Sequence, residues 1–252
     1  MASFDPRIAG IGKRLEKVGR VIAVTGGKGG IGKSVVASTL ALVAARKGLR
    51  AGLLDLDLTG PTAHVLLGVE ARLPTEEFGV DPLDADGVAF MSIACFAGES
   101  PAPLRGHDVT NALIEILAIT NWQELDLLVV DMPPGLGDAS LDVVRLLPRA
   151  EHLVIATASK LVLETVRRSL GLLTSSRAEI LGVLENMRRE SVDTAESDAV
   201  SELARKHGVP FLGALPFDDT LESRLGSTRM IAASRVAEAL EARLETLISE
   251  ES

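Results

Sequence analysis

The sequence predicts an α/β fold in which a doubly wound, mostly parallel sheet is flanked by helices. Short apolar runs, each of a length suited to a buried strand, alternate along the chain with segments of helical period, which is the order that parallel sheets require. The 252 residues are 46% hydrophobic, so the whole chain, 1–252, can share the core of a single domain. The predicted strands are residues 21–24, 49–54, 88–93, 127–130, 152–156, 180–184 and 211–214.

The spacing of apolar residues also predicts the helices and loops. Residues 8–18 carry apolar positions at near-helical spacing and predict a lead-in helix within the segment 1–19. Residues 34–47 predict the helix after the first strand, and residues 231–252 predict an acidic C-terminal helix. Loops are expected where the period is lost and turn-forming or polar residues gather, at 68–86 and 188–198.

Composition limits the partners and the compartment. The 26 Lys and Arg residues against 35 Asp and Glu give a formal net charge of −9, which repels phosphate backbones and anionic lipid headgroups. We therefore expect no nucleic acid and no membrane among the partners. The single cysteine, Cys95, cannot form an internal disulfide, and no apolar run reaches the roughly 20 residues of a membrane span. A cytoplasmic protein is expected.

A glycine-rich segment between the first predicted strand and the first helix has the Gly-x-x-x-x-Gly-Lys-Ser spacing of a P-loop NTPase, in a deviant Walker A form. In such a loop, consecutive backbone N–H groups converge on phosphate oxygens, and the helix N-terminus adds its positive dipole. We expect Lys33 to bridge the β- and γ-phosphates of ATP and Ser34 to bind Mg²⁺. The predicted ATP-binding residues of the loop are Gly27, Lys28, Gly29, Gly30, Ile31, Gly32, Lys33, Ser34 and Val35.

Aspartates at the ends of two strands complete the predicted phosphate site. Asp55 and Asp57 lie one alternation apart, so both can face the nucleotide; Asp57 is predicted to orient the attacking water and Asp55 to bind waters on Mg²⁺. Either could instead cap the following turn. Asp131 ends a fully apolar strand, as in a Walker B motif. The predicted magnesium site comprises Ser34, Asp55, Asp57 and Asp131.

Prolines and then glycines follow Asp131 directly. The order Pro133-Pro134 and then Gly135 joins a stiff element to a flexible one. Such a segment suits a switch that senses the γ-phosphate through the Gly135 N–H and moves when that phosphate departs.

Several motifs beyond the phosphate loop occur in order along the chain. They are Asp55 to Thr62 with its Gly-Pro, Leu104-Arg105-Gly106, Trp122 to Asp126, Asp131 to Asp138 with its Pro-Pro-Gly-x-Gly-Asp, Gly182 to Met187 and Phe211 to Pro216. With these motifs the sequence resembles the Mrp/ApbC-type P-loop ATPases from residue 21 to about residue 229. That branch comprises iron–sulfur cluster carriers within the larger group of MinD, ParA and the nitrogenase iron protein.

The resemblance implies an ATP-gated homodimer. In families with this Lys-Gly-Gly-x-Gly-Lys pattern, the extra lysine, here Lys28, contacts the nucleotide of the partner subunit, like an arginine finger supplied in trans. The implied catalytic residues are then Lys28, Lys33 and Asp57. Lys28 could instead be a solvated loop lysine. Relatives usually have a hydroxyl residue where this chain has Val35, whose backbone N–H can still bind the α-phosphate.

The resemblance also implies where adenine binds. Asn186 would hydrogen-bond the base edge, and the turn of Pro216, Phe217 and Asp218 would close the base pocket. On the residues alone, Asn186 could simply cap the end of its strand, and Pro216 could be an ordinary turn proline.

The cysteines of a cluster carrier are missing. Carriers of this family usually place a Cys-x-x-Cys pair after the segment that ends here at Met187, so that two subunits supply four thiolates, but residues 188–194 contain no cysteine. Cys95, in the apolar run 90–96, is interpreted as a buried packing residue of a strand. We therefore expect no stably bound iron–sulfur cluster. The histidines lack ligand spacing and are interpreted as surface residues or as histidines with satisfied hydrogen bonds: His64, His107, His152 and His207.

The sequence favours a Mg²⁺-dependent, slowly hydrolysing ATPase that assists maturation of iron–sulfur or other metallocluster proteins, with an apoprotein client that the sequence does not identify. An alternative is a MinD/ParA-like positioning or regulatory ATPase that recruits partner proteins. The acidic residues of the segment 236–252 disfavour membrane docking by such a protein. A further alternative is a binding switch with negligible hydrolysis.

Overall fold

The computed structural model describes residues 5–76, 79–97, 106–135, 137–189 and 198–248. Its strands form one eight-stranded sheet in the order β3-β4-β2-β5-β1-β6-β7-β8, parallel throughout except where β3 pairs with β4. The predicted doubly wound, mostly parallel sheet is confirmed. The strands are β1 Val18–Thr25, β2 Ala51–Asp55, β3 Leu83–Ala85, β4 Val88–Ser92, β5 Leu125–Asp131, β6 Glu151–Ala156, β7 Glu179–Arg188 and β8 Phe211–Pro216.

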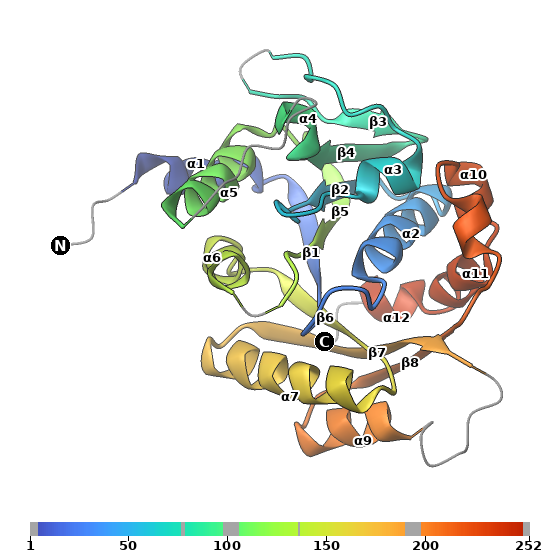
Figure 1. Ribbon diagram of the computed structural model, residues 1–252. Coiled ribbons are helices and arrows are strands. Elements are labelled where there is room, and N and C mark those ends of the chain that lie inside the picture. The colour runs from blue at the N-terminus through green and yellow to red at the C-terminus, as the bar shows by residue number, and fades with distance from the viewer. Residues whose placement is uncertain (1–4, 77–78, 98–105, 136, 190–197, 249–252) are drawn as a thin grey trace.

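Helices cover both faces of this sheet (Figure 1). The helices α2, α11 and α12 lie against one face, while α5, α6, α7 and α9 lie against the other, and α1 packs on α5. No described helix is long and apolar enough to cross a membrane. The helices are α1 Pro6–Arg14, α2 Lys33–Arg46, α3 Ala63–Leu67, α4 Ala94–Ala97, α5 His107–Ile119, α6 Asp138–Leu146, α7 Lys160–Ser175, α9 Ala199–Lys206, the 3-10 helix η1 Leu221–Arg224, α10 Thr228–Ile231, α11 Arg235–Glu241 and α12 Leu244–Ile248.

The central strands are buried on both faces. In β5, Leu127 and Val129 join one hydrophobic cluster, whereas Leu128 and Val130 join a second one. A strand between two helical layers must be apolar on both sides, so it has a continuous apolar run rather than an alternating pattern. This is why the apolar runs of the sequence located the sheet correctly.

The predicted loop 68–86 contains a strand that the sequence analysis missed. Residues Leu83–Ala85 form β3, which pairs antiparallel with β4. The connection is a tight turn in which Asp86 and Gly87 have φ of 57° and 86°, and Asp84 accepts a hydrogen bond from the Gly87 N–H at 3.1 Å. The Asp-Gly dipeptide is a recognised hairpin signal and could have located this turn.

The interpretation of Cys95 as a strand residue is wrong in one respect. β4 ends at Ser92, whose hydroxyl accepts a hydrogen bond from the Ala94 N–H at 3.2 Å and so begins the short helix α4. Cys95 lies in that helix and is 3% exposed, so its predicted burial is confirmed.

Both predicted terminal helices have different bounds in the structure. α1 ends at Arg14, before the predicted end at residue 18, because Val18 already pairs with Leu125 in the sheet. The C-terminal segment is not one helix but α10, α11 and α12. It is divided at Ser234, whose side chain caps α11 by accepting from the Ala237 N–H at 3.1 Å. A second division comes at Arg243, whose guanidinium donates to the carbonyl oxygens of Leu212 and Ala239 at 3.1 and 2.6 Å.

The interpretation of the histidines is wrong for His64 and His152. Each buries its Nδ1 without a hydrogen bond among the described residues. His152, in β6, is only 1% exposed, and burial lowers its pKa from 6.5 to about 4. Desolvation disfavours the charged imidazolium, so His152 is neutral in the folded protein near pH 7.

His152 gives a prediction for the pH dependence of stability. As the pH falls from about 6.5 to about 4, the unfolded chain takes up a proton at His152 that the folded protein does not. Between these pH values the unfolding free energy of wild type should therefore fall by about 2–3 kcal/mol more than that of His152→Leu. Above pH 6.5 the unfolding free energies of the two proteins should change in parallel. Denaturant titrations at several pH values measure this. His107→Leu, at an exposed position, serves as the control and should keep the wild-type slope; a wild-type slope in His152→Leu would contradict the assignment.

Candidate functional site

The segment 26–32 forms a loop between β1 and α2 at the carboxyl end of the sheet. Gly30 and Gly32 have φ of 77° and 83°, in the left-handed region that favours glycine. Gly32 is also the N-cap of α2, and since it has no side chain, it leaves the first N–H groups of the helix uncapped. The unblocked N-terminus of a 14-residue helix beside a glycine turn has the geometry that favours an anion. Phosphate binding by this loop stays a prediction.

Neighbouring elements hold this loop in place. A Cβ on Gly27 would approach the backbone carbon of Thr165 in α7 to 2.5 Å, so only glycine fits there. Asn186, in β7, donates from Nδ2 to the carbonyl oxygen of Ile31 at 2.9 Å. Within the loop region, Lys33 is 6% exposed whereas Lys28 is exposed. Lys33 thus belongs to the interior of the site, and Lys28 lies on its outer side.

Asp55 and Asp131 are neighbours at the ends of adjacent strands. They are partners in the parallel register of β2 with β5, and both are almost fully buried. Asp55 accepts hydrogen bonds from the Asp57 N–H at 3.0 Å, the Ala63 N–H at 3.2 Å and the Ser92 hydroxyl at 3.3 Å. Neither carboxylate oxygen of Asp131 has a hydrogen bond of ordinary geometry among the described residues.

Burial controls the protonation of this pair. It raises the pKa of Asp131 to about 7, and the negative charge of Asp55 adds to that shift, while the Ser34 hydroxyl and the Lys33 ammonium oppose it. Burial likewise raises the pKa of Asp55 to about 6, against its backbone hydrogen bonds. Buried carboxylates without partners are unfavourable unless a cation neutralises them.

The residues present fit a magnesium ion. Mg²⁺ takes oxygen ligands and is usually held by one or two carboxylates together with substrate phosphates and water. Asp131, Asp55 and the Ser34 hydroxyl supply such oxygens beside the phosphate loop. Among the described residues no group of three or more His, Cys, Asp and Glu side chains forms a metal site by itself, so the phosphates would complete the coordination shell.

Asp57 caps the following turn, which is the alternative that the sequence left open. Its Oδ1 accepts from the Thr59 N–H at 3.1 Å, the Thr59 hydroxyl at 2.7 Å and the Gly60 N–H at 3.1 Å, so it caps the following turn. Its Oδ2 is not used in that turn. The role of Asp57 in positioning water stays a prediction.

The residues predicted around adenine do converge. Asn186, Pro216, Phe217 and Asp218 line a small cavity together with Gly32 and Val35 from the phosphate loop and α2. Its volume is about 60 Å³, below the roughly 300–1,000 Å³ of a typical ligand pocket. A base would have to displace side chains in order to enter.

Besides Asn186, two of these side chains already have partners. Asp218 accepts from the Thr220 N–H and hydroxyl at 3.0 and 2.7 Å and from the Arg235 N–H at 3.1 Å. The Arg189 guanidinium lies 4.0 Å from the centre of the Phe217 ring. The contacts of both residues with adenine stay predictions.

The predicted switch is described except for residue 136. Gly135 has φ of 79°, and its carbonyl oxygen accepts a hydrogen bond from the Ser140 hydroxyl at 3.0 Å. The glycine permits this turn, and Ser140 ties it to the first turn of α6.

Sequence reasoning missed the contacts that support the site. It did not find Thr165, against which Gly27 packs, or the bond from Asn186 to the Ile31 carbonyl. It also missed the buried Glu185, paired with Arg188 at the end of β7. Each contact depends on chain packing or on a carbonyl group, and neither leaves a signal in residue type or spacing.

A family model described as "NUBPL iron-transfer P-loop NTPase", of the ParA group, matches residues 17–250. The chain belongs to this family. It is 36% identical over 214 residues to an iron–sulfur cluster carrier protein of Pseudomonas fragi, covering 80% of this chain and 74% of that protein. It is 34% identical over 234 residues to a cytosolic Fe–S cluster assembly factor Nubp2 homolog of Drosophila yakuba, covering 86% and 90%.

Other relatives are longer than this chain. It spans 41% of a chloroplastic Fe–S cluster assembly factor from Arabidopsis thaliana and 60% of the carrier protein from Aquifex aeolicus.

Solved structures confirm the fold. A nucleotide-binding protein of Archaeoglobus fulgidus, in complex with ADP, aligns with a TM-score of 0.73 at 30% identity over 92% of this chain and 93% of that one. The cell division protein MinD of Aquifex aeolicus aligns with a TM-score of 0.68 at 19% identity over 92% and 98%. The family and fold expected from the motifs are therefore confirmed.

The bond of Asn186 to the phosphate loop gives a prediction that separates two roles. If Asn186 acts through the Ile31 carbonyl, Asn186→Ala should weaken Mg-ATP and Mg-tripolyphosphate by similar factors, roughly 5- to 30-fold, since a buried acceptor loses its donor. If it reads adenine, only Mg-ATP should weaken. Titration calorimetry with both ligands distinguishes the outcomes, and Asn111→Ala, far along the chain in α5, is the control.

Proposed function

We propose that the protein is an ATP-binding, slowly hydrolysing dimeric switch that assists the assembly of iron–sulfur or other metallocluster proteins. One observation supports it above all: a chain of the iron-transfer NTPase family combines a phosphate loop with the buried Asp131 carboxylate, on which Ser34 and Lys33 of that loop act, and with the expected base pocket. The names of the Pseudomonas fragi and Drosophila yakuba relatives, a cluster carrier and a cluster assembly factor, support the choice of cargo.

In this proposal the chain's own groups divide the work. The N–H groups of the loop and Lys33 hold the phosphates, while Ser34, Asp55 and Asp131 hold magnesium. Magnesium would neutralise charge on the β- and γ-phosphates. Asp57, with an oxygen outside its turn, orients the attacking water. Burial of Asp131 and Lys33 keeps bulk water from weakening these interactions.

The cargo would be held by the client and not by this chain. Cys95 is 3% exposed, and burial raises the pKa of its thiol, which disfavours the thiolate that iron requires. The segment in which carriers have their Cys-x-x-Cys pair has no cysteine here, and its residues 190–194 lie outside the described residues. The proposed role is therefore to act on a metallocluster apoprotein.

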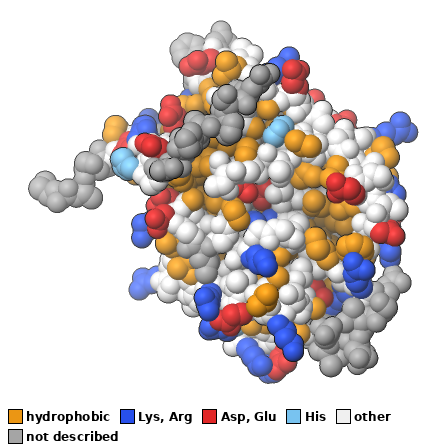
Figure 2. All heavy atoms as spheres, viewed as in Figure 1, with side chains coloured by type: hydrophobic (Ala, Val, Ile, Leu, Met, Phe, Trp, Pro, Cys, Tyr) orange, Lys and Arg blue, Asp and Glu red, His pale blue; other side chains and the backbone are white. Residues whose placement is uncertain are grey.

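Surface features favour a protein client. On the face shown in Figure 2, positive and negative side chains are interspersed, so this face does not form the basic surface that nucleic acid requires. The apolar side chains of the C-terminal segment, Leu240, Leu244 and Leu247, are buried in the chain's own core. They do not form the free apolar face with which a positioning ATPase of the alternative kind docks on a membrane.

A cargo experiment tests the proposal. Asp57→Ala, loaded with ATP in the native cytosol, should retain a cluster-requiring protein and its iron, whereas Lys33→Ala should not. After anaerobic incubation with iron and sulfide, wild type and Cys95→Ala should retain equally little iron by metal analysis. A cluster lost only from Cys95→Ala, or no Mg²⁺-dependent ATP turnover in wild type, would refute the proposal.

Lys28 gives the prediction for the dimer. Because it is exposed at the outer side of the loop, its proposed ligand is the nucleotide of a second copy. Lys28→Ala should weaken dimerisation with a non-hydrolysable ATP analogue and lower turnover by roughly 10²-fold or more, with less effect on nucleotide affinity. Sedimentation and ATPase assays measure these quantities. Lys13→Ala, an exposed lysine of α1, should behave as wild type; equal losses of all three properties in Lys28→Ala would exclude the role in trans.

A further inference from the structure

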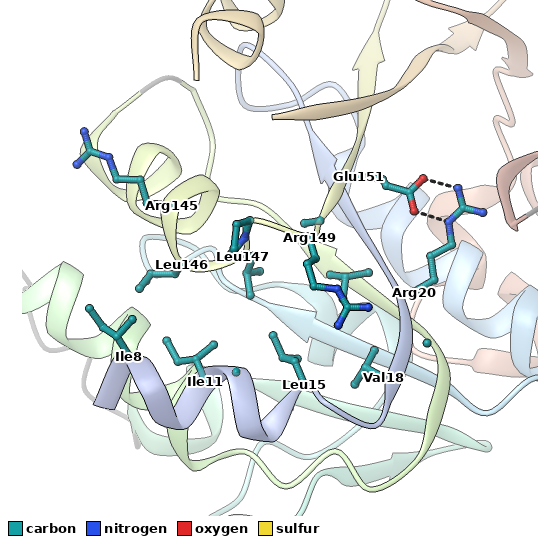
Figure 3. Close-up of a pocket in the computed structure, with 15 residues that line it drawn as sticks. Ile8, Ile11, Leu15, Val18, Arg20, Arg145, Leu146, Leu147, Arg149 and Glu151 are labelled. Carbon is teal, nitrogen blue, oxygen red and sulfur yellow. Dashed lines mark hydrogen bonds and ion pairs between the residues drawn. The ribbon is translucent and has the colours of Figure 1, made fainter. Parts of the chain in front are cut away.

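A second cavity lies away from the phosphate loop, where α1 and the start of β1 face the connection from α6 to β6 (Figure 3). Its volume is about 330 Å³, within the range of small-molecule pockets, roughly 300–1,000 Å³. It lies beside the first residues of β1, whereas the phosphate loop follows the last ones. The cavity is therefore at the amino end of β1, and the phosphate loop is at its carboxyl end.

The walls of the cavity are apolar. Ile8 and Ile11 of α1, with Leu15 just after it, point toward Leu146 and Leu147 at the end of α6. Ile8 is 48% exposed, although it belongs to a helix whose inner residue Ile11 is 2% exposed. An occupant of this cavity would remove the apolar surface of Ile8 from water, which favours binding of an apolar body.

Gly12 widens the α1 wall. A Cβ at this position would meet no atom within 4 Å, so a larger side chain there would project into open space instead of striking the protein. Gly12 lines the cavity, and the helix can accept a side chain at this position. It is therefore a position at which the cavity can be filled without disturbing its other walls.

The charged groups of the cavity differ in their partners. Arg20 and Glu151 form an ion pair at one end, and Arg145 is 76% exposed, lies 3.9 Å from Asp142 and points away from the cavity. Arg149 extends from the α6–β6 connection toward the α1 wall. Within the described part of the chain, Arg149 has no ion pair. The cavity thus combines an apolar body with one uncompensated guanidinium.

We propose that this cavity binds a small amphipathic carboxylate, with its aliphatic body between α1 and the α6–β6 connection and its carboxylate on Arg149. A planar guanidinium pairs with a carboxylate through two parallel hydrogen bonds, which sets this ligand apart from an alcohol or an amine of equal length. Arg149, the one cation of this lining without an ion pair among the described residues, suits a monoanion better than a phosphate dianion. This site is separate from the ATP site and independent of the proposed function.

Titration calorimetry with sodium octanoate, octan-1-ol and octylamine tests the proposal. Octanoate should bind saturably with one site per chain, and the alcohol and amine at least roughly 10-fold more weakly. Equal binding of octan-1-ol would show a plain apolar groove and overturn the carboxylate assignment. If sedimentation instead shows a dimer that Gly12→Leu dissociates, the occupant is a second copy of the chain and the proposal is wrong.

Variants with matched controls locate the site. Gly12→Leu should abolish octanoate binding, whereas Gly171→Leu, at an exposed glycine of α7 that also has no neighbour within 4 Å, should not. Arg149→Gln should weaken octanoate roughly 10-fold or more, whereas Arg145→Gln should not. All four variants should keep the wild-type affinity for Mg-ATP, which shows that they are folded. Wild-type octanoate binding in Gly12→Leu or in Arg149→Gln would refute the site.

Discussion

The site depends on two carboxyl groups that the sheet buries side by side. Asp55 and Asp131 end adjacent parallel strands as register partners, and Asp131 interacts with Ser34 and Lys33 of the phosphate loop. The chain gives Asp55 several hydrogen-bond donors but leaves Asp131 without one of ordinary geometry among the described residues. Burial raises both pKa values, with the charge of Asp55 adding to the shift of Asp131 and the charge of Asp57 adding to that of Asp55, so the pair is unfavourable in its ionised form without a cation. The sheet therefore buries two carboxyl groups whose ionised form a bound cation would stabilise.

The sequence was sufficient to predict those elements whose residue types are set by a local physical requirement. Central strands covered by helices on both faces must be apolar throughout, so β1, β2 and β5 were visible as runs. A phosphate loop needs glycine at particular backbone angles and a lysine at the helix start, so its spacing identified it. The same logic failed for the C-terminal segment, because its division into helices depends on Ser234 and on contacts of Arg243 with β8.

At the candidate site, the sequence predicted which residues meet but not which partners their polar groups bind. Asn186, Pro216, Phe217 and Asp218 were predicted from a resemblance to lie at the base pocket, and the structure brings them together with Val35. What could not be predicted is how their polar groups are used. Asn186 bonds a loop carbonyl and Asp218 caps backbone amides; these are choices among partners that become available only when distant segments meet. For Asp57 the sequence left turn capping open, and the structure shows that role for one of its oxygens.

The covering of α2 by α11 and α12 has a consequence for biosynthesis. α2 carries the phosphate loop at its start, and its far side is covered by residues near position 240, including Leu240 and Leu247. During translation the phosphate loop is made early, whereas the helices that cover α2 are made late. A nascent chain that still holds residues 235–248 in the ribosome therefore leaves the apolar face of α2 that α11 and α12 cover exposed to water.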